Sequence, residues 1–128
     1  HQHSPEINQE LSNLAGKKLE VIFVPHLLPL NRGILATVYA KKTNKAQNLV
    51  ELYKKFYKKE PFVRIKASGE FPRIKDVAGT NFCDIGIQDA GDSVIIIASI
   101  DNLLKGASGQ AVQNMNIMYN FPEDTALL

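Results

Sequence analysis

The sequence predicts an α+β domain with a mainly antiparallel or mixed sheet and helices on one face. Three observations support this class. Five short segments are rich in β-branched residues or alternate apolar with polar residues, as strands do. Three longer segments repeat apolar residues at helical spacing. The order α, β, β, α, β, β, β, α lacks the strict alternation of a doubly wound parallel sheet. We expect one domain over residues 1–128.

The first predicted helix spans residues 5–15. Ser4 offers a hydroxyl to cap free N–H groups, and Pro5 stands where no donor is missed. Glu6 lies at the positive end of the helix dipole, and Gly16 ends the helix.

Two strands are predicted next, at residues 19–24 and 33–41, and we expect them to pair. The first is almost entirely apolar and suits a strand covered on both faces, whereas the second alternates. Pro25 and Pro29 bracket the rigid connection between them, which contains His26.

An amphipathic helix is predicted over residues 45–58, with Thr43 or Asn44 as its cap and Glu60 before Pro61 as its end. Its lysine-rich face is expected to lie in solvent.

Three further strands, a loop and a last helix complete the prediction. The strands span 62–66, 82–88 and 93–100, with a loop at 67–81 and a hairpin turn at 89–92. The last helix spans 107–119, and a terminal turn follows from Asn120. Its inward residues are expected to be Ala111, Val112, Met115 and Tyr119. An uncovered sheet face is a natural place for a second subunit to pack.

Composition excludes several classes of protein. Fifteen Lys and Arg against 13 Asp and Glu give a net charge of +2, so no nucleic-acid partner is expected. The longest apolar stretches are too short to span a bilayer, so we expect no membrane partner and no signal peptide. The single cysteine, Cys83, allows no internal disulfide and fits a reducing, cytoplasmic setting. Because the first residue is His1 and not Met, we expect a piece of a longer polypeptide.

Histidines are the first candidates for chemistry. In an extended segment, His1 and His3 point to the same side, and Glu6 is close enough in sequence to orient His3. Imidazole titrates near neutral pH and therefore suits general acid or base catalysis. A Zn²⁺ site would need a further ligand such as His26, and the spacing matches no standard zinc motif, so no metal is predicted. The alternative is that these histidines are solvated residues without a role.

Two other features are candidate binding elements. Arg32 follows the proline-bracketed loop and can offer its guanidinium to a phosphate or carboxylate. Small residues from Gly106 to Gly109 lead into the last helix and would let a planar or anionic ligand approach free N–H groups. Cys83 lies within a predicted strand without a basic neighbour in sequence, so it is interpreted as core and not as a nucleophile.

Four ordered blocks together resemble N-acetyl-gamma-glutamyl-phosphate reductase over essentially the whole chain. They are His-Gln-His-Ser-Pro-Glu-Ile at 1–7, Pro-His-Leu with Arg-Gly-Ile at 25–34, Asn-Phe-Cys-Asp-Ile-Gly at 81–86, and Asp-Asn-Leu-Leu-Lys-Gly-Ala-Ser-Gly-Gln-Ala-Val-Gln-Asn at 101–114. The resemblance implies NADPH-dependent reduction of N-acetyl-glutamyl phosphate to its semialdehyde, with phosphate release, in arginine biosynthesis. It also implies a fold like the C-terminal domain of glyceraldehyde-3-phosphate dehydrogenase, and a homo-oligomer, either dimer or tetramer, formed through the sheet face.

The resemblance also implies site residues. The family uses a cysteine thiolate that forms a thioester, which accepts hydride, and an imidazole for proton transfer. It implies His3, or else His1, as the acid/base, Glu6 as the group that orients it, and Arg32 as a contact to an anionic part of the substrate. The implied cofactor contacts are Gly106, Gly109 and Gln110, although a sister family often has Asn at the position of Gln110.

Two family elements are absent from these residues: the Gly-Cys-Tyr-Pro-like nucleophile motif and the phosphate-binding loop of an N-terminal Rossmann domain. NADP(H) would therefore be bound mainly by a domain outside this chain, and the chain alone is expected to be inactive. Two alternatives stay open: a stand-alone dimerisation or regulatory module, and a histidine-based metal-binding domain.

Overall fold

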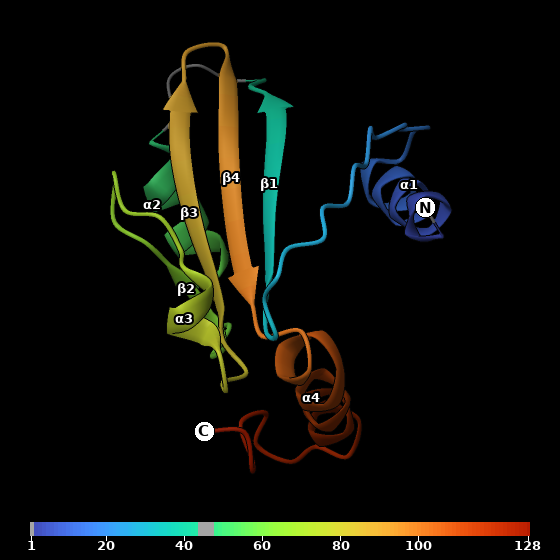
Figure 1. Ribbon diagram of the computed structural model, residues 1–128, viewed down its shortest axis with the longest axis vertical. Coiled ribbons are helices and arrows are strands. Elements are labelled where there is room, and N and C mark those ends of the chain that lie inside the picture. The colour runs from blue at the N-terminus through green and yellow to red at the C-terminus, as the bar shows by residue number, and fades with distance from the viewer. Residues whose placement is uncertain (1, 44–47) are drawn as a thin grey trace. The chain divides into compact units, whose positions relative to one another are not determined.

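The computed structural model describes residues 2–43 and 48–128 of the chain. By internal contacts the chain divides into two compact units, His1–Leu30 and Asn31–Leu128 (Figure 1). No helix among the described residues is long and apolar enough to cross a membrane.

The first unit contains helix α1 (His3–Ala15). It ends as predicted at Gly16, whose φ of 63° is the left-handed conformation that glycine adopts without strain. Its start differs from the prediction. Gln2 already has helical angles, φ −58° and ψ −27°, and precedes the helix without a side-chain cap. The expected extended segment before Ser4, and the cap at Ser4, are therefore wrong.

Residues 19–24 do not form the predicted strand. A strand requires a partner for its backbone groups, and residues 2–30 contain no other strand. The backbone N–H of Leu19 instead donates to Ser12 Oγ of α1 (2.8 Å), and that of Val21 donates to Asn8 Oδ1 (2.9 Å). Apolar side chains of this segment remain in solvent, and Ile22 is 93% exposed.

The second unit is built on a four-stranded mixed sheet in the order β1-β4-β3-β2, which confirms the α+β class (Figure 1). Strand β4 (Ser93–Ile100) pairs antiparallel with β1 (Ile34–Lys41) and with β3 (Cys83–Ala90). The short β2 (Val63–Ile65) pairs parallel with β3. Strand β1 therefore pairs with β4. The expected pairing of β1 with residues 19–24 is wrong.

Helix α2 (Leu49–Phe56) covers one face of this sheet. Asn48 caps it by accepting the N–H of Glu51, so Thr43 is not the cap, while Asn44 and the predicted start at 45–47 lie outside the described residues. Its apolar stripe packs on a core of Ile85, Ile87 and Val94.

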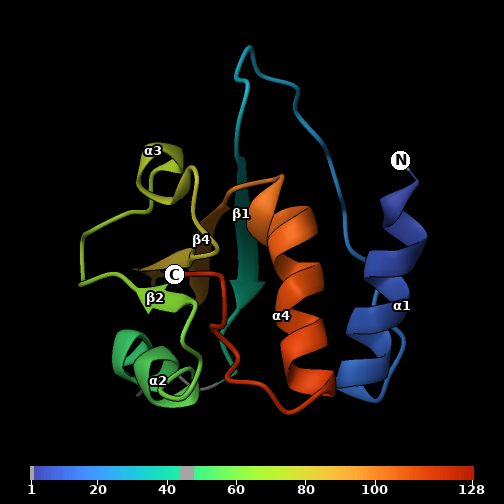
Figure 2. The same ribbon diagram turned by 90° about the horizontal axis from the view of Figure 1, so that it is seen from below.

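The opposite face receives part of the predicted loop at 67–81, which also contains the short helix α3 (Ile74–Val77). Gly86 points away from the α2 side, because it alternates with Ile85 and Ile87 along β3. A Cβ on Gly86 would lie 2.7 Å from Pro72 Cδ, so the loop packs directly on that glycine. Figure 2 shows α2 and α3 on opposite sides of the strands.

After β4 the chain forms a one-turn π-helix, η1 (Leu104–Ser108), and then α4 (Gly109–Met118). The predicted inward face of the last helix is wrong: Met115 and Tyr119 are exposed, whereas Gln113 and Asn116 are buried. The side chain of Asn116 donates to the carbonyls of Glu123 and Thr125 in the C-terminal turns. The buried face of α4 is polar because it holds the C-terminal turns by hydrogen bonds.

Candidate functional site

In the first unit, His3 is the first residue of α1 and Glu6 lies in its first turn. Residues three apart lie on the same side of a helix, so the two side chains are neighbours there. Both are exposed, and His26 is exposed in the segment that follows the helix. His1, the alternative acid/base, lies outside the described residues.

In the second unit, Arg32 is held by Asp101, which directly follows β4. The Arg32 Nη1 donates to both carboxylate oxygens of Asp101, at 3.0 and 2.9 Å. The Arg32 side chain is 46% exposed, whereas that of Asp101 is fully buried. Among the described residues, both contacts of the guanidinium run through Nη1, so Nε and Nη2 keep donors for an anionic group.

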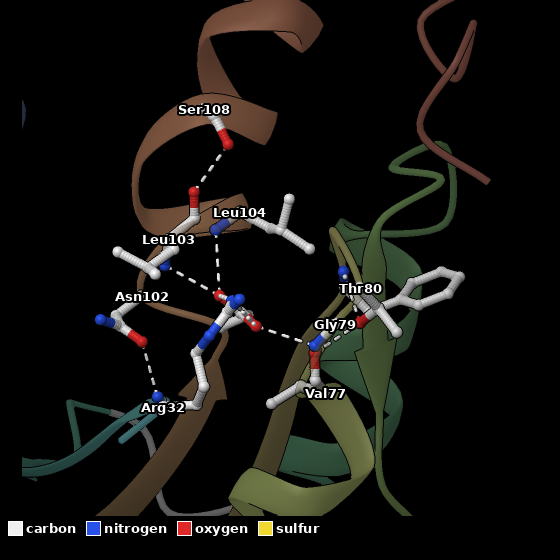
Figure 3. Close-up of polar contacts among 11 residues, drawn as sticks. Arg32, Val77, Gly79, Thr80, Asn102, Leu103, Leu104 and Ser108 are labelled. Carbon is white, nitrogen blue, oxygen red and sulfur yellow. Dashed lines mark hydrogen bonds and ion pairs between the residues drawn. The ribbon is translucent and has the colours of Figure 1, made fainter. Parts of the chain in front are cut away.

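The carboxylate of Asp101 also accepts three backbone N–H groups, as Figure 3 shows. Those of Leu103 and Leu104 donate to Oδ1 at 2.8 and 3.0 Å, and that of Gly79 donates to Oδ2 at 2.8 Å. Burial alone would raise the pKa of Asp101, but these hydrogen bonds and the charge of Arg32 outweigh it and lower the pKa to about 2.

Asn102, the next residue along the chain, is hydrogen-bonded to Gly33, the residue after Arg32. Its Oδ1 accepts the backbone N–H of Gly33 at 2.7 Å (Figure 3). Gly33 has a φ of 103°, and a Cβ there would collide with the side chain of Ile74. A larger residue is excluded at this point both by backbone conformation and by space. Two consecutive residues after β4 thus hold the two residues before β1.

The turn that carries the predicted cofactor contacts begins at Asp101. The N–H of Gly106 donates to the Asp101 carbonyl at 2.9 Å, and that of Ser108 donates to the Leu103 carbonyl at 3.0 Å, both five residues back. Ser108 Oγ also donates to the Leu103 carbonyl at 2.7 Å (Figure 3). One-turn π-helices are rare in proteins, and those that do occur are often found at functional sites.

The three predicted cofactor residues differ in environment. Gly106 is exposed, Gly109 is buried, and Gln110 is partly exposed. The Gln110 side chain donates to Asn114 Oδ1 on its own helix at 2.8 Å. A Cβ on Gly109 would collide with Asn81 Oδ1, which has no hydrogen-bond donor among the described residues. Gly109 therefore serves close packing, while Gly106 leaves its surface open.

A buried polar cluster lies beside the start of α4. Gln113 Oε1 accepts from Asn81 Nδ2 at 3.1 Å and from Lys105 Nζ at 2.6 Å, while Gln113 Nε2 donates to Glu123 at 2.5 Å. Burial lowers the pKa of Lys105. The Lys105 side chain is partly buried, and its ammonium donates to Gln113 Oε1.

Cys83 begins β3 and is partly buried. Burial raises its pKa, although the charge of Lys105 acts in the opposite direction. A raised pKa leaves the side chain as a thiol at neutral pH, which agrees with its interpretation as core.

A cavity of about 310 Å³ lies on the α3 side and is lined by Lys66, Glu70, Phe71, Arg73 and Asp76. Its cations already have carboxylate partners. Lys66 is 2.6 Å from the buried Asp84, and Arg73 is 2.8 Å from Asp76. Both cations that line the cavity are thus ion-paired.

Comparison with known proteins places this chain. The family model described as "Semialdehyde dehydrogenase, dimerisation domain" matches residues 1–102. The chain belongs to the semialdehyde dehydrogenase dimerisation-domain family. This match and the named relatives described next together confirm the resemblance stated from the sequence.

Relatives of this dimerisation domain carry the name N-acetyl-gamma-glutamyl-phosphate reductase. The chain is 55% identical to that of Geobacter metallireducens and 54% identical to that of Pelotomaculum thermopropionicum, over 99% of its length. It is 49% identical to that of Staphylococcus aureus, again over 99% of its length. In each case it spans 38% of the relative.

The dimerisation domain also resembles a solved structure, that of aspartate semialdehyde dehydrogenase II from Vibrio cholerae. The TM-score is 0.59 at 17% identity, over 73% of this chain and 29% of that one. At this identity the likeness concerns the fold.

Sequence reasoning missed Asp101, although a signal was available. An Asp directly after an apolar strand can accept the N–H groups two and three residues on, which is a common turn for this residue type. The structure brings Arg32 and the turn at 104–108 to the same carboxylate. His3 and Glu6 belong to the other unit.

Proposed function

We propose that this chain is part of an N-acetyl-gamma-glutamyl-phosphate reductase. That enzyme would reduce N-acetyl-glutamyl 5-phosphate with NADPH and a proton, giving N-acetyl-glutamate 5-semialdehyde, NADP⁺ and phosphate, in arginine biosynthesis in the cytoplasm. The observation that carries the proposal is 55% identity over 99% of the chain to a relative with that name. The chain supplies 38% of that relative's length, so the activity would belong to the longer protein.

We assign proton transfer to His3, or else to His1, with Glu6 as its orienting group. The support is that His3 and Glu6 lie on one side of α1 at its exposed N-terminal end. Imidazole is suited to give a proton to the forming product and to take one back in the reverse direction.

We assign Arg32 to an anionic part of the substrate. Asp101 holds its Nη1, so the remaining donors are presented in a fixed direction by a half-exposed side chain. A guanidinium held in this way suits a carboxylate or phosphate group.

NADP(H) would be bound mainly by residues outside this chain, with Gly106, Gly109 and Gln110 beside the nicotinamide. When bound, the cofactor supplies the hydride. The exposed Gly106 fits the approach of a planar ring, because it lies at the surface and has no side chain. These residues would leave room for the nicotinamide ring and would not hold the pyrophosphate.

The chain by itself would be inactive. Its only cysteine is Cys83, which lies in a strand, partly buried, with a raised pKa. A thioester requires an accessible thiolate, and Cys83 does not offer one.

The test is a reductase assay in the phosphate-dependent oxidative direction, with N-acetyl-glutamate semialdehyde and NADP⁺. It compares this chain with the longer protein that contains it. We expect turnover only from the longer protein, and His3→Gln in that protein should lower kcat by about 100-fold or more. His26→Gln is the matched control, because His26 is also exposed in the first unit and has no assigned role.

Three outcomes contradict parts of the proposal. Activity of the short chain would refute the account of the missing nucleophile. Equal activity of the His3 and His26 variants would refute the assignment of His3. A longer protein that dimerises but does not turn over would favour the second candidate, a stand-alone dimerisation module, which the family description supports.

A further inference from the structure

The buried carboxylate of Asp101 links three segments that are far apart in sequence. It accepts hydrogen bonds from Arg32 before β1, from Gly79 after α3, and from Leu103 and Leu104 at the entrance to η1. Three backbone N–H groups are sufficient to stabilise a buried carboxylate. The pairing with the half-exposed Arg32 adds to this stabilisation and also fixes the direction of the guanidinium.

Asp101 also holds the first half of the turn at 104–108, both through its side chain and through its backbone carbonyl. Its side chain accepts the N–H groups of Leu103 and Leu104, and its own carbonyl accepts that of Gly106. Ser108 fixes the second half through its bond to the Leu103 carbonyl. A change at Asp101 would therefore move the turn and Arg32 together, whereas a change at Ser108 would move the turn alone.

We infer that Asp101 is a positioning residue that sets the direction of Arg32 and the path of the turn at 104–108 as one unit. This inference rests on the proposed function, which assigns Arg32 to the anionic substrate and the turn to the nicotinamide side of the cofactor. Asp101 itself is buried and would therefore touch neither ligand. Its role is to keep the substrate contact of Arg32 and the cofactor contact of the turn at a fixed position relative to each other.

The inference predicts a kinetic pattern that a purely structural role would not produce. In the longer protein, Asp101→Asn should raise KM for both NADP⁺ and the semialdehyde at least fivefold, with kcat per folded protein changed less than threefold. Arg32→Met should raise only the KM for the semialdehyde. If Asp101 served stability alone, its variant would lose folded protein and keep both KM values.

Asp89→Asn is the matched control, because it is the same substitution at an ion-paired Asp. Its partner is Lys42, at 2.7 Å, and it lies at the opposite end of the β3–β4 pairing, where we expect both KM values to be unchanged. Hydrogen exchange supplies a readout other than activity. Exchange of the segment 103–108 should accelerate in Asp101→Asn and not in Asp89→Asn.

Ser108→Ala provides a second test that does not disturb the buried charge. It removes one hydrogen bond of an exposed side chain, so the fold should persist. We expect it to raise KM for NADP⁺ at least threefold and to leave KM for the semialdehyde unchanged. If Asp101→Asn does not fold, this variant tests the inferred effect of the turn on NADP⁺ binding, and an unchanged KM for NADP⁺ overturns the inference.

The experiment separates the inference from the proposed function. An inactive wild-type longer protein overturns the proposed function and the inference with it. An active wild type whose Asp101→Asn variant keeps both KM values overturns the inference alone.

Discussion

The buried carboxylate of Asp101 holds several segments of the candidate site together by hydrogen bonds. Removing Asp101 from water is unfavourable in itself, and its three backbone donors and Arg32 compensate for that cost. The pKa of about 2 in the folded protein, against the ordinary value of 3.8 for an aspartate side chain, expresses the balance. A lowered pKa in the folded state means that the ionised carboxylate stabilises the fold.

This balance predicts a pH dependence of stability. The contribution of Asp101 is fully present above the unfolded pKa of 3.8 and is lost as pH falls through about 2. Its size is about 2 kcal/mol, since one pKa unit corresponds to about 1.4 kcal/mol. Urea unfolding between pH 6 and pH 2.5 should therefore show that the free-energy difference between wild type and Asp101→Asn shrinks as the pH falls. A difference that is constant over this range would contradict the assignment.

A second prediction at this scale concerns two glycines of the same turn. A Cβ at Gly109 would meet Asn81 Oδ1 and lie 2.9 Å from the Leu104 carbonyl carbon, whereas a Cβ at Gly106 would meet nothing closer than 3.4 Å. We expect Gly109→Ala to lower the free energy of unfolding by about 1–3 kcal/mol, as overpacking does. Gly106→Ala should change it by less than about 1 kcal/mol. Thermal or urea unfolding of both variants measures this, and equal effects would refute it.

At the scale of elements, local patterns predicted most of the second unit. The alternating or β-branched segments predicted β1 and β3 within two residues and β4 at its observed bounds, Ser93–Ile100. Strand β2 is one residue shorter than predicted at each end, and α2 ends at Phe56, two residues before its predicted end. These patterns succeed because the core face of each element is apolar.

The same reasoning fails where burial is polar or a partner is missing. In α4 the buried positions are Gln113 and Asn116, which are satisfied by hydrogen bonds to the tail, so an apolar stripe does not mark the inward face. Residues 19–24 have a strand's composition but no strand beside them within residues 2–30. At the site, Arg32 was predicted as a candidate, whereas its pairing with Asp101 joins residues 69 positions apart in the sequence and has no local signal.

The contact between α1 and the segment after it yields a prediction for this element. Ser12 Oγ accepts the N–H of Leu19 at 2.8 Å and lies 3.3 Å from the Leu19 carbonyl, to which it donates. Ser12→Ala removes both bonds, each of which contributes about 1 kcal/mol. Hydrogen exchange at Leu19 should accelerate at least fivefold, while Gln9→Ala, an exposed change on the same helix, should leave it unaltered. Unchanged exchange at Leu19 would show that Ser12 does not hold the segment.

At the scale of the whole molecule, the sheet leaves apolar side chains uncovered. The α2 side of the sheet carries Ile85 and Ile87, so Leu35 and Tyr39 of β1 and Ile95 and Ile97 of β4 face the other way, with Ile95 directly opposite Tyr39. All of β1 is exposed, and Tyr39 is 73% exposed. Exposed apolar patches of this kind are typical of interfaces, and the family model describes a dimerisation domain. We propose that this face joins two copies of the chain.

The last prediction tests that interface in the longer protein. Tyr39→Glu places a charge within the proposed contact, where its desolvation would oppose association, so we expect the dissociation constant of the oligomer to rise at least tenfold. Phe56→Glu is the matched control, because Phe56 is also an exposed aromatic, 76% exposed, but lies on α2. Sedimentation equilibrium measures both. If both variants associate as the wild type does, the contact lies on another surface. If Phe56→Glu dissociates the oligomer and Tyr39→Glu does not, the α2 side of the sheet forms the interface instead.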